Sequence, residues 1–368
     1  MSQGLTREIA YDAMQNFFIN KPFVLFGTGP SIAMDKRFGM ENLKKFLCKK
    51  IPKENLTGRE KTEWDRVVEF LDRDNNLESA LNEVKEENLL KKLIGLTFEL
   101  LGKLNKKYHW QILSGEKTWT ALPLFKRLVN ALPETDRILH TATPNYDLLA
   151  EYAFEMEQIP YITGFCGGVY RRLDWKQAQQ SMTYIEMEKN PRSKKIKKVT
   201  KIKKHIRLYK VHGSLNTFML NNEIVENNYW MCKCPGDIER VMIMPGAQKY
   251  ERLHDYRQAL LKEYDNAIEK HNAFLFIGFG FNDDQLINHL FKAKLINHKC
   301  PALIITRDSN KKIESLLSKS ENLWLICKQP GGGEKSTMIC NSRYNDNLYL
   351  NGKQLWDAGQ FAAEILGG

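Results

Sequence analysis

Short runs of consecutive apolar residues alternate along this chain with longer segments in which apolar residues recur every three or four positions. The runs are typical of strands buried on both faces of a parallel sheet, and the spaced pattern is typical of amphipathic helices. The alternation predicts an α/β fold, Rossmann-like, with a mostly parallel sheet covered by helices on both faces. The predicted strands are residues 23–26, 137–143, 161–169, 181–187, 206–211, 241–244, 273–277 and 301–305.

The helical pattern starts with apolar residues at every fourth position from Leu5 to Phe17, which predicts a first helix beside the first strand. Residues 40–130 show similar spacing over a much longer stretch, and we interpret them as a helical insertion whose Leu and Phe stripes are core. A closing helix is predicted over residues 352–366. We expect residues 1–368 to form a single domain, with a second, basic hairpin or loop insertion at 181–236.

Glycine and polar residues follow the first strand. Gly27 and Gly29 lack a Cβ, so the backbone can approach a ligand closely, and Ser31 stands at a helix start. Such a loop can offer backbone N–H groups to a phosphate, although glycine can equally serve the turn alone. The dehydrogenase form of the motif is excluded, because position 32 is Ile and no second strand ending in an acidic residue follows.

Three later strands also end in polar or glycine residues. The carboxyl ends of parallel strands line the ligand crevice in α/β folds, so we expect these residues at one site. Taken singly, each is as well explained by a turn or a hydrogen-bonded structural residue, and His140, inside a strand, is assigned to the core. The residues are Asn145 and Asp147 after 137–143, His212, Gly213 and Ser214 after 206–211, and Gly278, Gly280 and Asp283 after 273–277.

Positive charge is concentrated in one stretch. The formal net charge is +11, and the segment Arg192–Lys210 alone has ten Lys or Arg and no Asp or Glu. The rest of the chain is therefore near neutral, which argues against a nucleic-acid footprint over the whole protein. We favour lysines that protect an exposed sheet edge; contact with DNA or with an acidic surface of a partner is the minority interpretation.

Compartment and metal content follow from the cysteines and the hydropathy. Seven cysteines show no disulfide framework, and the first residues lack a signal-peptide core, so we expect a reducing, cytoplasmic location. No apolar run reaches 18 residues, so no membrane span is expected. The only close cysteine pair is Cys232-x-Cys234, and four zinc ligands cannot be assembled.

Together, the ordered motifs G-x-G-x-S, T-x-N-Y-D, H-G-S and G-x-G-x-x-D resemble those of the sirtuin fold. The resemblance is to the sirtuin-like NADases of bacterial antiphage defence more than to the protein deacetylases. The deacetylases have a Pro-Asp-Phe-Arg-like segment and a Gln before the Asn. This chain has Asp35-Lys36-Arg37-Phe38-Gly39 and Pro144 at these places, and it lacks the zinc module.

The resemblance implies NAD as the substrate and a role for each strand end. Gly27, Thr28, Gly29 and Ser31 would hold the diphosphate. Asn145 and Asp147 would line the pocket for nicotinamide and its ribose, with Asn145 also positioning a water. His212 would be the general base, with Gly213 and Ser214 beside it, and Gly278, Gly280 and Asp283 would bound the adenosine half.

The expected activity is that of an NAD+ glycohydrolase that releases nicotinamide and ADP-ribose and depletes NAD during phage infection. Activation would come from a partner or from assembly; the resemblance implies a homo-oligomer and, as one kind of partner, a HerA-type ATPase or DNA translocase. Two alternatives stay open. One is an NAD-dependent protein deacylase or ADP-ribosyltransferase, and the other is a non-catalytic nucleotide- or DNA-binding subunit organised around Arg192–Lys210.

Overall fold

The computed structural model describes residues 4–74, 76–189, 196–236, 238–242, 251–283, 286–287 and 289–367. Within these residues nine strands form one large sheet. They are β1 (Phe23–Phe26), β2 (Ile138–Thr143), β3 (Tyr161–Ile162), β8 (His205–Lys210), β12 (Phe274–Ile277), β13 (Ala302–Ile305), β14 (Leu323–Lys328), β15 (Ser336–Cys340) and β16 (Leu348–Asn351). Their order is β16-β15-β14-β13-β12-β1-β2-β8-β3.

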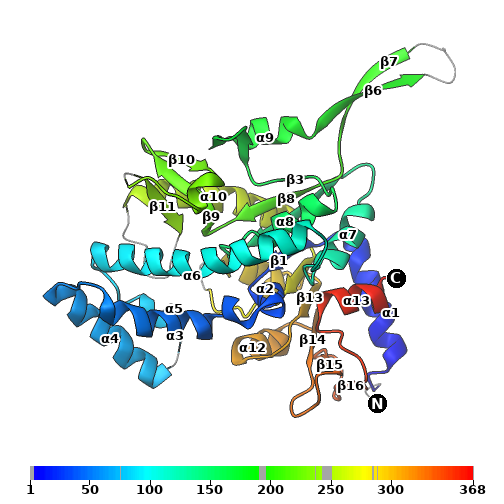
Figure 1. Ribbon diagram of the computed structural model, residues 1–368. Coiled ribbons are helices and arrows are strands. Elements are labelled where there is room, and N and C mark those ends of the chain that lie inside the picture. Colours follow the sequence, from blue (N-terminus) through cyan, green and yellow to red (C-terminus); the bar gives the residue numbers. More distant parts are fainter. Residues whose placement is uncertain are drawn as a thin grey trace.

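The large sheet is parallel from β14 to β3, and β15 and β16 extend it as an antiparallel edge. Helices cover both of its faces (Figure 1). One face carries α1 (Arg7–Phe17), α6 (Glu87–Leu113), α7 (Leu122–Asn130), α8 (Leu149–Met156) and α13 (Ala358–Ile365), and the other carries α10 (Glu251–Lys270), α11 (His289–Lys292) and α12 (Lys311–Lys319). The predicted α/β class and the covered parallel sheet are confirmed.

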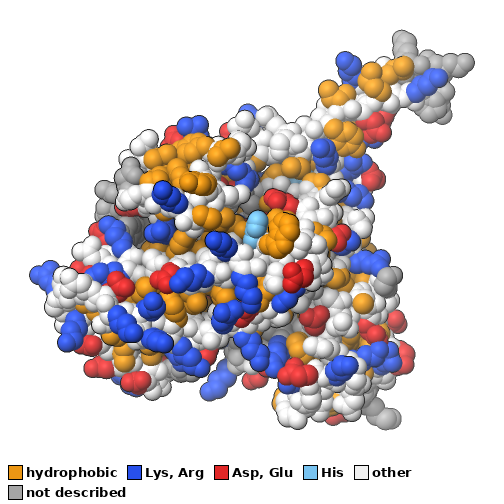
Figure 2. Space-filling model, in the orientation of Figure 1, with side chains coloured by type: hydrophobic (Ala, Val, Ile, Leu, Met, Phe, Trp, Pro, Cys, Tyr) orange, Lys and Arg blue, Asp and Glu red, His pale blue; other side chains and the backbone are white. Residues whose placement is uncertain are grey.

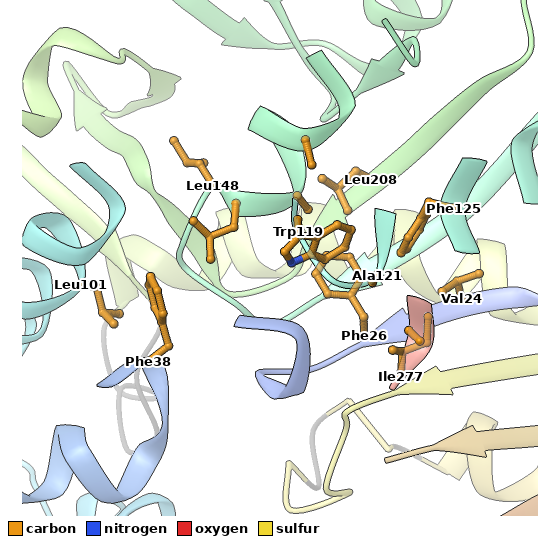
Figure 3. Close-up of a cluster of buried hydrophobic side chains, with 14 of the residues drawn as sticks. Val24, Phe26, Phe38, Leu101, Trp119, Ala121, Phe125, Leu148, Leu208 and Ile277 are labelled. Carbon is orange, nitrogen blue, oxygen red and sulfur yellow. The ribbon is translucent and has the colours of Figure 1, made fainter. Parts of the chain in front are cut away.

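Strand β1 shows why these short sequences become central strands. Successive side chains point to opposite faces of a sheet. Val24 and Phe26 accordingly enter the core under α6 and α7, whereas Phe23 and Leu25 enter the core under α10 and α11. Figure 3 shows Phe26 against Trp119, near Phe125. A strand buried on both faces therefore reads as an unbroken apolar run.

The described part of residues 40–130 is mostly helical. Besides α6 and α7 it contains α3 (Met40–Lys50), α4 (Gly58–Asp74) and α5 (Leu77–Leu81). Helix α6 packs on α3 and α4 and also on α8, which follows β2 in the chain. This contact holds the helical segment close to the carboxyl end of β2, beside α2 (Gly29–Met34) in Figure 1.

The predicted single strand 161–169 is wrong in extent. The structure has β3 at its start and a separate strand β4 (Phe165–Gly167), which belongs to a five-stranded antiparallel sheet. The chain turns between them at Gly164, where φ is +86° and the ring of Trp175 occupies the place of a Cβ. The other strands of this sheet are β5 (Arg171–Leu173), β9 (Gly213–Leu220), β10 (Glu223–Glu226) and β11 (Glu239–Met242).

The segment 181–236 is divided among three sheets. Strands β6 (Thr183–Lys189) and β7 (Ile196–Ile202) form a separate two-stranded ribbon. Strand β8 instead lies between β2 and β3 in the large sheet, because its buried side chains pack in the main core, and β9 and β10 belong to the small sheet. Of this segment, only the ribbon stands away from the body (Figure 1).

One further prediction needs correction at its start. The closing helix α13 begins at Ala358 rather than near Gly352, because β16 ends at Asn351 and Gly352 turns the chain with φ of +74°. The Asp357 side chain caps the helix by accepting from the N–H of Gln360 at 3.0 Å. Residues 243 and 244 of the predicted strand 241–244 lie outside the described residues. None of the described helices is long and apolar enough to cross a membrane.

Candidate functional site

One cavity, of about 200 Å³, lies where the carboxyl ends of β1, β2, β8 and β12 meet. Strands β2 and β8 lie on one side of β1, and the later strands β12 and β13 lie on the other, so the cavity sits at a topological switch point. Its lining includes eight of the residues singled out from the sequence. They are Gly27, Thr28, Asn145, Asp147, His212, Gly278, Gly280 and Asp283.

The glycines of the first loop lie against the loop after β12. The N–H of Gly27 donates to the Ile277 carbonyl at 2.9 Å, and that of Gly29 donates to the Gly278 carbonyl at 3.0 Å. A Cβ on Gly29 would lie 2.5 Å from Gly278 Cα. Both N–H groups are thus used within the protein, and these glycines serve the close approach of two loops rather than offering free donors to a phosphate.

Asn145 is fixed on one side of its amide only. The residue is 4% exposed, and its Nδ2 donates to the Gly27 carbonyl at 2.9 Å and to Ser31 Oγ at 3.4 Å. Its Oδ1 is buried and has no hydrogen-bond partner among the described residues. Such an atom carries a desolvation cost unless a ligand or a water donates to it. Asn145 therefore offers an oriented acceptor at the cavity.

Asp147 is held by several donors. Its Oδ2 accepts from Ser31 Oγ at 2.9 Å, and its Oδ1 accepts from the Leu149 N–H at 3.2 Å. Burial raises the pKa of this carboxyl, while the charge of Lys210 and the hydrogen bond from Ser31 oppose the rise. Ser31 Oγ therefore connects the carboxyl group of Asp147 to the side-chain amide of Asn145 and fixes the position of that amide.

Lys210 brings a buried cation to the same region. Its Nζ donates to the Asp147 carbonyl at 2.6 Å and forms an ion pair with Glu151 at 2.9 Å. Both side chains are buried, and burial raises the pKa of Glu151 against the effect of the lysine. The loop after β2 is therefore fixed by a desolvated ion pair behind it.

His212 and Asp283 form a pair at the cavity. Nε2 of His212 lies 3.0 Å from Oδ2 of Asp283, and each side chain is 13% exposed. Because a carboxylate can only accept, Nε2 donates the hydrogen of this contact, and Nδ1 is the nitrogen that has the lone pair when the ring is neutral. A carboxylate that fixes the tautomer and stabilises the protonated ring is the arrangement by which a histidine becomes an oriented base.

The four remaining site residues that the sequence singled out lie beside the cavity rather than in its lining. Gly29 and Ser31 belong to α2, under the first loop. Gly213 has φ of +76° and the Val241 carbonyl where a Cβ would be, so it serves the backbone path. Ser214 Oγ donates to the Tyr146 carbonyl at 3.3 Å. Their contacts are with the protein's own loops.

The helical segment supplies a wall that the sequence did not reveal. Leu43 of α3, Leu81 of α5 and Leu101 of α6 line the cavity, together with Phe38 and Met40. The three leucines were predicted to be core, and their amphipathic spacing gave no signal of a second role. The wall also covers the site, because it lies over the strand ends.

Three polar residues of the lining were also missed: Glu78, Tyr146 and Asn282. Glu78 of α5 carries a carboxylate to the cavity, and Tyr146 lies between Asn145 and Asp147 in the sequence. Burial, with a contribution from the charges of Glu78 and Asp283, raises the pKa of the Tyr146 phenol. The phenol therefore stays protonated and remains a hydrogen-bond donor at neutral pH.

No three His, Cys, Asp or Glu side chains in the described ranges are placed to share a metal ion. Cys232 is exposed, and Cys234 is half-buried with its Sγ donating to the Ile238 carbonyl at 3.6 Å.

Comparison with known proteins gives one family. The model of a family described as SIR2-like domain matches residues 140–326, about half of the chain. The matched region starts within β2 and ends within β14, so it contains Asn145, Asp147, His212 and Asp283 and leaves out the first glycine loop. No curated protein matched this chain.

Proposed function

The chain belongs to the family of SIR2-like domains, which use NAD, and we propose that it is an NAD+ glycohydrolase. The proposed reaction is hydrolysis of the bond between nicotinamide and ribose, with nicotinamide and ADP-ribose as products. The observation that carries the proposal is that a carboxylate-paired histidine and the unpartnered Oδ1 of Asn145 line one cavity.

The chemistry of this bond explains which groups are needed. Nicotinamide leaves as a neutral molecule while positive charge builds on the ribose, as on the sugar in glycoside hydrolysis. The leaving group needs no strong acid. The site must instead stabilise the developing charge, orient a water, and accept a proton from that water or from a ribose hydroxyl.

The residues of the cavity supply these functions. Asn145 Oδ1 accepts a hydrogen from the attacking water and thereby aims its oxygen at the ribose carbon. His212 Nδ1 accepts the proton, and Asp283 stabilises the imidazolium that forms. The carboxylate of Asp283 also lies in this lining, where its negative charge favours a cationic sugar.

The apolar wall supports hydrolysis by limiting access to bulk water. Leu43, Leu81 and Leu101 line the cavity opposite polar groups, and a low-polarity surround strengthens each electrostatic interaction inside. On the resemblance described above, this hydrolysis would deplete the NAD of a cell under phage attack once a partner or assembly activates it.

The test is incubation with NAD+ and chromatographic separation of the products, with and without an acetylated peptide. We expect nicotinamide and ADP-ribose from the activated wild-type protein in both mixtures, and loss of both products in His212→Ala. Formation of acetyl-ADP-ribose only when the peptide is present would instead assign the site to deacylation. Intact NAD+ in every mixture, including those with added candidate partner proteins, would refute the proposal.

A further inference from the structure

The ribbon of β6 and β7 is a long element with few neighbours in the fold. Seven residue pairs join the strands in antiparallel register, from Thr183 with Ile202 to Lys189 with Ile196. The ribbon stands out from the body (Figure 1), and seven residues extend for about 23 Å. Its foot is fixed by Arg137, whose Nη1 donates to the hydroxyl of Tyr184 at 2.9 Å and to the Ile202 carbonyl at 3.0 Å.

The register divides the side chains of the ribbon between two faces. Directly opposed residues share a face, and the faces alternate along each strand. One face, here called the apolar-basic face, has large apolar side chains in the open: Ile185 is 66% exposed, Met187 59% and Ile196 66%. Its full set is Thr183, Ile185, Met187, Lys189, Ile196, Lys198, Thr200 and Ile202.

The charges of the two faces differ in kind. Lys189 and Lys198 are the charged residues of the apolar-basic face, which carries no carboxylate. Figure 2 shows hydrophobic and basic side chains together along the projecting ribbon. Exposed apolar groups bordered by positive charge favour a partner that is itself anionic.

The acidic residues of the ribbon lie on the opposite face, where lysines neutralise their charge. Lys201 forms ion pairs with Glu186 and with Glu188, each at 2.7 Å, and Lys197 lies opposite Glu188. These contacts raise the pKa of Lys201 and lower that of Glu188. No negative charge of the described ribbon therefore faces an anion that approaches the apolar-basic face.

We propose that the apolar-basic face of this ribbon docks on double-stranded DNA in its major groove. The major groove of B-form DNA, about 12 Å wide, admits a two-stranded β-ribbon. In that position Lys189 and Lys198 reach phosphates, and Ile185, Met187 and Ile196 contact sugars and thymine methyl groups. The interaction is separate from the cavity and does not depend on the proposed NAD+ hydrolysis.

Other occupants fit the face less well. Single-stranded nucleic acid binds through aromatic stacking, and this face has no aromatic residue, since Tyr184 lies on the other face and contacts Arg137. The major groove of duplex RNA is too narrow for side chains to read. A second copy of the same face would bring lysines against lysines.

The experiment measures binding of the full-length protein to a fluorescent 30-base-pair duplex by anisotropy at several salt concentrations. Lys198→Gln is compared with Lys197→Gln, because these neighbours lie on opposite faces of the same strand. Loss of one phosphate contact lowers the slope of log affinity against log salt by about 0.9. We therefore expect severalfold weaker binding and a smaller slope for Lys198→Gln, and wild-type values for Lys197→Gln.

Four results would overturn the proposal. The first is absence of wild-type binding at low salt, and the second is equal binding by the two variants. The third is equal competition by poly-glutamate at matched charge, which would assign the face to acidic proteins. Sedimentation of Ile196→Ser tests self-association, and conversion of an oligomer into a monomer by this change would assign the face to a second copy. Circular dichroism and thermal unfolding control for folding, which we expect the exposed substitutions to leave unchanged.

Discussion

Nε2 of His212 lies 3.0 Å from Oδ2 of Asp283, which joins the ends of β8 and β12 across the cavity. The resemblance to sirtuin-like NADases implies different parts of the ligand for these two residues, with Asp283 beside the adenosine half. The contact instead makes the aspartate a partner of the proposed base.

His212→Ala should lower kcat for NAD+ hydrolysis by about 10²–10⁴-fold, because the variant lacks the proton acceptor. Asp283→Asn should lower kcat by less and leave KM nearly unchanged, since the ring keeps a neighbour but loses the charge that stabilises its protonated form. The matched control is His298→Ala, an exposed histidine outside the cavity lining, which should retain wild-type rates. Full activity of His212→Ala would contradict the assigned role.

Asn145→Ala should reduce hydrolysis while binding of NAD+ persists, because the variant loses the acceptor that orients water. Calorimetry and initial rates measure the two quantities separately. The change also leaves the Gly27 carbonyl and Ser31 without their donor, so the free energy of unfolding should fall by about 1–3 kcal/mol. Equal losses of binding and turnover would show that Asn145 contributes to binding of NAD+ and not to the hydrolysis step.

Gly29→Ala should push the first loop away from Gly278 and destabilise the protein by about 1–3 kcal/mol, because the new methyl group has no room. Gly95→Ala is the control, since nothing lies within 4 Å of a Cβ at this position of α6. That change should stabilise the protein by about 0.5–1 kcal/mol through helix propensity. Urea unfolding measures both, and a stable, fully active Gly29→Ala protein would refute the packing argument.

Lys210→Met should cost about 3–5 kcal/mol, because Glu151 is left as a buried carboxylate without its cation. The double variant Lys210→Met, Glu151→Leu should recover much of this loss, since it removes both desolvated charges together. Urea unfolding of the wild type, both single variants and the double variant gives the coupling energy. Additive effects would mean that the ion pair does not couple the two side chains.

Stability should fall in acid partly through His140. Burial and the nearby positive groups lower the pKa of His140 to about 2, against about 6.5 in the unfolded chain. The unfolded state therefore binds the extra proton as pH falls below about 6.5, and each further unit removes up to about 1.4 kcal/mol of stability.

The comparison for this effect is His140→Gln, which can keep a hydrogen bond to the Tyr209 hydroxyl that His140 Nδ1 contacts at 2.8 Å. Burial raises the pKa of Glu226 to about 7, so this carboxyl stabilises the fold as pH falls over part of the same range. Glu226 contributes equally in both proteins, so its contribution cancels when the stability of the wild type is subtracted from that of the variant at each pH. His140→Gln should lose less stability than the wild type between pH 7.5 and pH 5.0, and identical losses would contradict the assignment.

The sequence predicted β1, β2, β8, β12 and β13 of the large sheet, because these strands stand out as apolar runs such as Phe23–Phe26. It did not predict β14, β15 or β16. The prediction of strand boundaries was wrong where one glycine changes the direction of the chain. Gly164 divides a stretch that reads as one strand, and only the ring of Trp175 packed against it explains the turn. A contact of this kind joins two residues that no shared hydrophobic periodicity relates, so it cannot be recognised in the sequence.

For the site, the strand ends were visible in the sequence because parallel strands bring their carboxyl ends together. The partners of each side chain were not visible. Ser31 was expected at a phosphate and instead donates to Asp147, and Glu78 lies in an amphipathic helix like many others in the chain. Pairing across a crevice depends on loop conformations, which periodicity does not encode.

Two different parts of the chain line opposite sides of the cavity. The sheet supplies Asn145, His212 and Asp283, whereas α3, α5 and α6 supply Leu43, Leu81 and Leu101. Substitutions in this apolar wall can therefore change which ligand enters the cavity and how tightly it is enclosed, while the reactive groups keep their positions. Selectivity and reactivity are in this way separable properties, open to independent change by mutation.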